Sequence, residues 1–167
     1  FLGTTMDAYF KKVDEDHREA HGTPVPAGFF ETLMKDSRED MDAALVAIDG
    51  THAAVQSIAV PLAVASSSGI ERLHFKLNKA GLIEAFAPHI YSGELVQNGK
   101  PEPDLYLHTA EQLNIPAEAC VAIEDSVYGV ISAKAAGMSV VGFTGGGHCR
   151  AGHGRYLSNA GADTVVN

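Results

Sequence analysis

From residue 57 onward, short apolar runs alternate with helical stretches, and this alternation constrains the fold more than any other feature of the sequence. Apolar runs of strand length stand at Ser57–Ala65, His89–Ser92, Cys120–Ile123, Ser139–Phe143 and Asp163–Val166. Helices are predicted between them at Ile70–Ala80, Asp104–Leu113, Val127–Ala136 and Arg150–Asn159. Strands that alternate with helices predict an α/β fold, in which a Rossmann-like parallel sheet carries helices on both faces.

The upstream part of the chain has a different character. Residues 6–20 and 28–45 predict two helices rich in charged side chains, with apolar residues at helical spacing. A linker that contains Pro24 and Pro26 separates them. We therefore divide the chain into a helical segment at 1–46 and an α/β segment at 47–167.

The charge balance excludes some classes of partner. With 12 basic and 21 acidic residues the formal net charge is −9, which disfavours a nucleic-acid groove or an anionic membrane surface. A small phosphorylated ligand is compatible with this net charge, because a metal ion or one lysine offsets the charge of the ligand locally. Two cysteines make no disulfide framework and predict a reducing, cytoplasmic compartment. Nothing in the sequence indicates an oligomeric state.

Polar residues follow three of the predicted strands, where the chemistry of parallel sheets is located. Ser66-Ser67-Ser68-Gly69 offers a hydroxyl and backbone N–H groups to an anion, or simply caps the next helix. Prolines stiffen the turn around Lys100, which is either a neutraliser of phosphate or a solvated loop lysine.

Two adjacent acids, Glu124 and Asp125, end the third apolar strand. Hard carboxylate oxygens are suitable ligands for Mg²⁺, whereas helix capping by Asp125 or Ser126 explains one acid more easily than both. Ser66, Lys100 and Glu124 follow one another at intervals of about one strand–helix unit. We therefore expect them to converge on one edge of the sheet.

Three segments carry a resemblance to a known family: VASSSG (64–69), GKPEPDLYL (99–107) and VAIEDSVYGVISAKAAGM (121–138). They resemble motifs two, three and four of the haloacid-dehalogenase (HAD) superfamily. The likeness is greatest to the β-phosphoglucomutase-like and phosphoglycolate-phosphatase-like hydrolases with an α-helical cap, and it covers essentially the whole chain. The opening residues 1–17 resemble the middle of that cap, so 1–46 would be a partial cap.

The resemblance implies Mg²⁺-dependent phosphoryl transfer through an aspartyl-phosphate, on a small phosphorylated metabolite. Ser66 would bind the transferring phosphoryl oxygens and Lys100 would neutralise charge, while Asp125 and Glu124 would serve the metal. A phosphatase is the first expectation and a sugar phosphomutase the second. The two magnesium acids argue against a dehalogenase proper.

The first motif of that family, an apolar strand ending in D-x-D-G, has no counterpart here. Ala47-Ile48-Asp49-Gly50-Thr51 mimics only its second half, since Ala47 stands at the nucleophile position. We expect Asp49 to cap a helix at 51–57, and the chain to be N-terminally incomplete and to lack the first strand of its sheet. The alternative is a truncated binding module without catalysis, whose gap accepts a strand from another chain.

Two further segments bear on specificity. Residues 4–7 align with the specificity loop of the cap, and Met6 matches the arginine that β-phosphoglucomutases carry there, which favours a phosphatase. Thr5 and Ser67 are expected to contact substrate. In GGGHCRAGHG (145–154), His148, Cys149 and His153 offer only three of the four ligands that zinc normally takes, so a glycine-rich loop at the active edge is the preferred interpretation.

Overall fold

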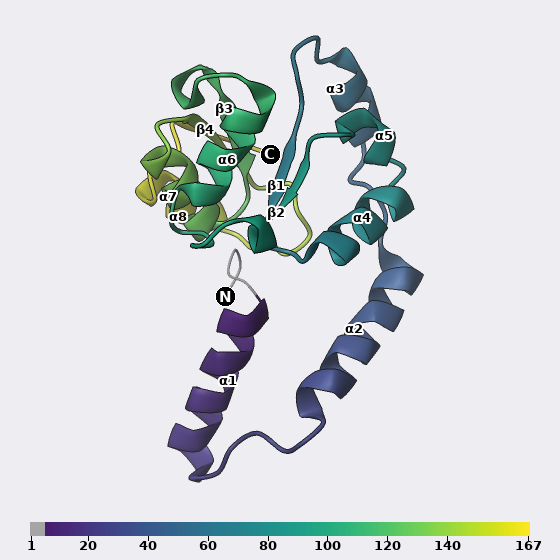
Figure 1. The fold of residues 1–167 in the computed structure, drawn as a ribbon, viewed down its shortest axis with the longest axis vertical. Coiled ribbons are helices and arrows are strands. Elements are labelled where there is room, and N and C mark those ends of the chain that lie inside the picture. Colours follow the sequence, from purple (N-terminus) through teal and green to yellow (C-terminus); the bar gives the residue numbers. More distant parts are fainter. Residues whose placement is uncertain (1–5) are drawn as a thin grey trace.

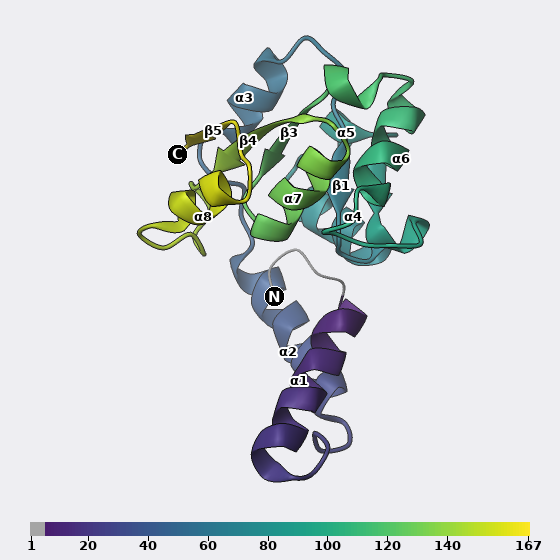
Figure 2. The ribbon, with the colours of Figure 1, turned by 90° about the vertical axis from the view of Figure 1, so that its left-hand side faces the viewer.

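A pair of helices projects from one end of an α/β body in the computed structural model, which describes residues 6–167 (Figures 1 and 2). The pair consists of α1 (Met6–His21) and α2 (Phe29–Ala44). The rings of Phe10 and Phe30 stack between them, with centroids 4.4 Å apart. The Asp14 carboxylate accepts a hydrogen bond from the Val25 N–H at 2.8 Å, which fastens the connecting linker to α1.

The helix pair is followed by α3 (Thr51–Ser57) and by a short strand, β1 (Val64–Ser66). The predicted strand at Ser57–Ala65 was therefore too long. Pro61 interrupts that apolar run and has no N–H to give to a ladder, so pairing begins only beyond it. The predicted cap at Asp49 was also wrong: α3 starts from Gly50, whose φ of 84° favours glycine, and no side chain caps the helix.

The remaining elements follow the predicted alternation. The helices are α4 (Ile70–Lys79), α5 (Ile83–Phe86), α6 (Asp104–Leu113), α7 (Val127–Ala135) and α8 (His153–Asn159). The strands are β2 (Ile90–Ser92), β3 (Val121–Glu124), β4 (Ser139–Phe143) and β5 (Thr164–Val166). Two short 3₁₀ turns cover Gly93–Leu95 and Ala117–Ala119. The sequence analysis did not anticipate α5.

All strand pairs are parallel, and they form two sheets. One sheet pairs β1 with β2, in a register that sets Ser66 opposite Ser92. The other has the order β3-β4-β5. Helices α6, α7 and α8 lie on one side of the strands, and α3, α4 and α5 on the other (Figures 1 and 2). The predicted parallel α/β architecture is confirmed, and β1 and β3 belong to separate sheets.

Two buried apolar clusters support this arrangement. The larger one packs α6, α7 and α8 against β3 and β4, around the fully buried Val130, Val140 and Leu157. The smaller one joins α4 to β2 through Leu73, Leu77 and Ile90. The face of β3 that carries Val121 and Ile123 is not covered in this way, since these side chains are 64% and 66% exposed.

Among the described residues, no helix is both long enough and apolar enough to cross a bilayer.

Candidate functional site

Lys100, which follows β2, lies at the centre of a buried polar network. Its ammonium donates to the backbone carbonyl of Ala65 in β1 at 3.1 Å and to the hydroxyl of Tyr106 at 3.2 Å. It also forms a buried ion pair with the carboxylate of Glu124 at the end of β3. These three acceptors match the three N–H donors of an ammonium group, and they connect the two sheets. The expected convergence of Lys100 and Glu124 with the end of β1 is thus confirmed.

Glu124 is held from several directions. One carboxylate oxygen accepts from Lys100 and from the hydroxyl of Tyr106. The other accepts from the hydroxyl of Ser126 at 3.1 Å. The same hydroxyl receives the backbone N–H of Gly129 at 3.0 Å and so caps α7. Of the two capping alternatives, Ser126 therefore fulfils that role, while Glu124 faces inward as the partner of Lys100.

Tyr106 belongs to this network although sequence reasoning passed over it. Burial raises the pKa of its hydroxyl far above the usual value, and the neighbouring Glu124 charge raises it further. The phenol therefore stays protonated and remains a donor to Glu124. The sequence does contain a signal for Tyr106, because this residue stands on the buried face of a predicted helix, six residues after Lys100.

Asp125 points away from this network. Its carboxylate is half-exposed, and Oδ2 lies 3.4 Å from Nε2 of His148. Its backbone carbonyl accepts a hydrogen bond from Nε2 of His153 at 2.7 Å. The loop between β4 and α8 therefore reaches the same sheet edge, as expected from its sequence position. Of the two predicted magnesium acids, Asp125 has the accessible oxygens that a hard cation requires, whereas both oxygens of Glu124 have protein partners.

The serines after β1 are arranged differently from a helix cap. The hydroxyl of Ser66 accepts from the N–H of Ser68 at 3.2 Å, and Lys76 donates to the hydroxyl of Ser68 at 3.2 Å. At the start of α4, the Glu94 carboxylate accepts from the N–H of Ile70 at 3.0 Å. Capping by a serine was thus wrong at this helix. Glu94 stands two residues after a predicted strand, and that position was the signal for it.

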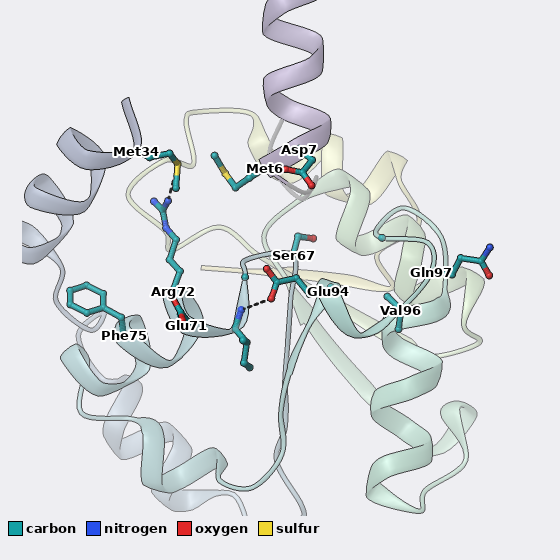
Figure 3. A pocket seen from close by; sticks show the side chains of 14 residues that line it. Met6, Asp7, Met34, Ser67, Glu71, Arg72, Phe75, Glu94, Val96 and Gln97 are labelled. Carbon is teal, nitrogen blue, oxygen red and sulfur yellow. Dashed lines mark hydrogen bonds between the residues drawn. The ribbon is translucent and has the colours of Figure 1, made fainter. Parts of the chain in front are cut away.

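A cavity of about 860 Å³ opens between the helix pair and the start of α4 (Figure 3). Ser67 lines it, together with three acids, Asp7, Glu71 and Glu94. Arg72 crosses it toward α2, where its guanidinium donates to the hydroxyl of Ser37 at 3.1 Å.

Two residues of the predicted specificity loop have different outcomes. Met6 lines the cavity, rather than serving only as a packing residue of a helix. Thr5 lies outside the described residues.

Comparisons with known proteins find related sequences and structures. The profile of the haloacid dehalogenase-like hydrolases matches residues 1–143. A 6-phosphogluconate phosphatase of Escherichia coli is 33% identical over 107 residues, which are 64% of this chain and 48% of that protein. The chain thus spans about half the length of that phosphatase.

Solved structures show the same likeness. A haloacid dehalogenase-like protein of Agrobacterium tumefaciens matches with a TM-score of 0.84 and 36% identity, covering 93% of this chain and 71% of that one. A HAD family hydrolase of Deinococcus radiodurans, with bound phosphate and sodium, has a TM-score of 0.73 and 35% identity. That match covers 100% of this chain and 72% of the other.

Proposed function

The chain belongs to the haloacid dehalogenase-like hydrolase family, and we propose that the whole protein is a Mg²⁺-dependent phosphatase of small phosphorylated sugars. The observation that carries the proposal is the buried Lys100–Glu124 pair, which connects the carboxyl ends of β1 and β3, where Ser66 and Asp125 stand. The phosphatase identity of the Escherichia coli relative supports it, as does the phosphate bound in the Deinococcus radiodurans structure.

Each residue has a distinct role in this proposal. The hydroxyl of Ser66 donates to an oxygen of the transferring phosphoryl group. Lys100 exchanges one of its present acceptors for that group and so neutralises charge in a buried setting, where the interaction is strong. The carboxylate of Asp125 holds Mg²⁺, which supplies charge neutralisation of the phosphate when bound. Glu124 keeps Lys100 in position.

The nucleophile in this proposal is an aspartate on a strand seated between β1 and β3. The separation of the two sheets supports such a position, as does the span of Lys100 from Ala65 to Glu124. The carboxylate oxygen forms a bond to phosphorus, while the bond from phosphorus to the ester oxygen breaks and that oxygen takes a proton from a second aspartate. Water then gives a proton to the second aspartate and attacks phosphorus, and the bond from phosphorus to the carboxylate oxygen breaks. This step releases inorganic phosphate and restores both aspartates.

The cavity supports a sugar phosphate as the substrate class. Its volume of about 860 Å³ lies in the range of pockets for small metabolites. The carboxylates of Asp7, Glu71 and Glu94 are acceptors for sugar hydroxyls. With residues 1–46 as a partial cap, α1 and α2 form the wall of the cavity opposite α4. Met6 stands where a mutase of this family has an arginine, which favours hydrolysis over phosphate relocation.

The test is a screen for phosphate release by the whole protein, with and without Mg²⁺, against sugar phosphates. Asp125→Ala should abolish Mg²⁺-dependent turnover, whereas Glu118→Ala, which removes an exposed acid before the opposite end of β3, should leave it intact. Interconversion of sugar phosphates without phosphate release would identify a phosphomutase instead. Phosphate binding without any turnover would identify a binding module.

A further inference from the structure

The loop between β4 and α8, together with the first residue of α8, gathers three metal-ligating side chains in one place. His148, Cys149 and His153 each offer one ligand atom, and these atoms all lie within 4.8 Å of one another. Two of the three are adjacent in sequence, and Gly152, with a φ of 88°, turns the chain so that the third joins them. None of these three side chains has a role in the proposed phosphatase reaction.

The hydrogen bonds around the cluster leave lone pairs available for a cation. The carbonyl of Asp125 only accepts, so Nε2 of His153 carries a proton in their 2.7 Å contact. In the neutral ring, Nδ1 is then the nitrogen with a lone pair. Histidines that bind metals commonly donate their other nitrogen to a backbone carbonyl in this way, which fixes the tautomer.

The distances around His148 suit a small tetrahedral ion. Its Nε2 lies 3.4 Å from the sulfur of Cys149 and 3.4 Å from Oδ2 of Asp125. Ligand atoms on a tetrahedral zinc ion are separated by about 3.3 to 3.6 Å, given ordinary Zn–N, Zn–O and Zn–S bond lengths. The carboxylate of Asp125 lies beside His148 but outside the group whose ligand atoms are all within 4.8 Å of one another, so it supplies the fourth ligand by turning toward the cluster.

We propose that His148, Cys149 and His153 bind one transition-metal ion of the zinc class, with the carboxylate of Asp125 as the fourth ligand. A thiolate and two imidazoles select Zn²⁺ or Co²⁺, whereas Mg²⁺ takes oxygen ligands. The proposal is independent of phosphatase activity, because it uses only the chemistry and spacing of these four side chains.

The experiment is a titration of the metal-free, reduced whole protein with Co²⁺, followed by absorption spectroscopy. One equivalent should produce a thiolate-to-cobalt charge-transfer band in the near ultraviolet and the intense visible bands of tetrahedral cobalt. One equivalent of Zn²⁺ should remove both signals, and a large excess of Mg²⁺ should leave them in place.

Two serine variants separate the site from adventitious binding. Cys149→Ser should remove the charge-transfer band and weaken Co²⁺ binding by roughly tenfold or more, because it deletes a direct ligand. Cys120→Ser is the matched control, since this other cysteine lies outside the cluster and should leave the spectrum unchanged. Circular dichroism confirms that both variants are folded. A spectrum without the charge-transfer band, or one that Cys149→Ser retains, would overturn the proposal and leave the cluster as an ordinary thiol–imidazole contact.

Discussion

The carboxylate of Glu124 occupies the space that a side chain at Gly129 would fill. A methyl group at position 129 would overlap this carboxylate, which is held in place by Lys100, Tyr106 and Ser126. The absence of a side chain in the first turn of α7 thus sets the position of a buried charge at the end of β3.

Gly129→Ala should therefore destabilise the protein, by about 1–3 kcal/mol, because the carboxylate must leave its hydrogen bonds or α7 must shift. Urea unfolding followed by circular dichroism measures the change as a lower midpoint. Gly147→Ala is the matched control, since a Cβ there meets nothing within 4 Å. Equal midpoints for the two variants would show that α7 has room to adjust.

The buried ion pair predicts a pattern of non-additive stabilities. Glu124→Gln leaves the Lys100 ammonium without a counter-charge and should cost about 3 kcal/mol, whereas Tyr106→Phe removes one neutral donor and should cost about 1 kcal/mol. The double variant Lys100→Met, Glu124→Leu should recover most of the loss, because neither charge is left unpaired. Chemical denaturation of the three variants checks this order, and a double variant that is less stable than Glu124→Gln would contradict it.

Asp163 predicts a specific acid sensitivity. The hydrogen bonds from the Lys134 ammonium, at 2.9 and 3.0 Å, hold the pKa of Asp163 below its usual value, and the Val140 N–H at 2.7 Å lowers it further. When the folded-state pKa is lower than the unfolded-state pKa, the group stabilises the protein at pH values above the unfolded-state pKa. This contribution is lost as the pH falls through the folded-state pKa. Asp163→Asn should thus lower the Tm at pH 7, and its Tm should converge with that of the unmodified protein once the pH is below the lowered folded-state pKa of Asp163.

Lys134→Met is the companion to that experiment. It removes the largest cause of the lowered pKa, so less stability should be lost on acidification, and the loss should be complete at a higher pH. An unchanged acid transition in both variants would show that the Lys134–Asp163 contact does not persist in solution.

Zinc should inhibit the proposed phosphatase, because Asp125 serves both the proposed magnesium site and the proposed zinc-class site. Added Zn²⁺ should reduce Mg²⁺-dependent turnover, and Cys149→Ser should relieve the inhibition by roughly tenfold or more in zinc concentration. Steady-state phosphate release over a zinc titration measures both. Inhibition of equal potency in the two proteins would place the inhibitory ion elsewhere.

Arg72 predicts discrimination among sugar phosphates. Its guanidinium lines the cavity and is the natural partner for a substrate carboxylate. Arg72→Met should raise the KM for carboxylate-bearing sugar phosphates by roughly tenfold or more, and the KM for neutral polyol phosphates by much less. The ratio between the two classes is the readout, because a general disturbance of α2, which Arg72 also contacts, would affect both equally.

The parallel architecture and the convergence of Lys100 with Glu124 could be predicted from sequence because both depend on chain order. Strand ends meet at one edge of a parallel sheet whatever the details of packing. Side-chain directions cannot be predicted in this way, because no local sequence pattern carries them. They decide which oxygen of Glu124 faces Lys100, and they turn Asp125 toward His148. Tyr106 and Glu94 had visible positions in the sequence, but the partners of their side chains could not be predicted for the same reason. The overextended first strand was avoidable, because Pro61 is visible in the sequence.

The two buried clusters differ in extent, with nine buried residues in one and three in the other among those described. Opening of a part of a protein costs less where less apolar surface is packed. Backbone amides of α4 should therefore exchange with solvent faster than those of α7, in hydrogen-exchange experiments on the native state. The wall of the cavity that carries Arg72 lies on α4, while the Lys100–Glu124 pair adjoins the larger cluster. In the proposed function, the cavity wall on α4 can thus fluctuate independently of the Lys100–Glu124 pair, and can adapt to different ligands while the two charges keep their positions.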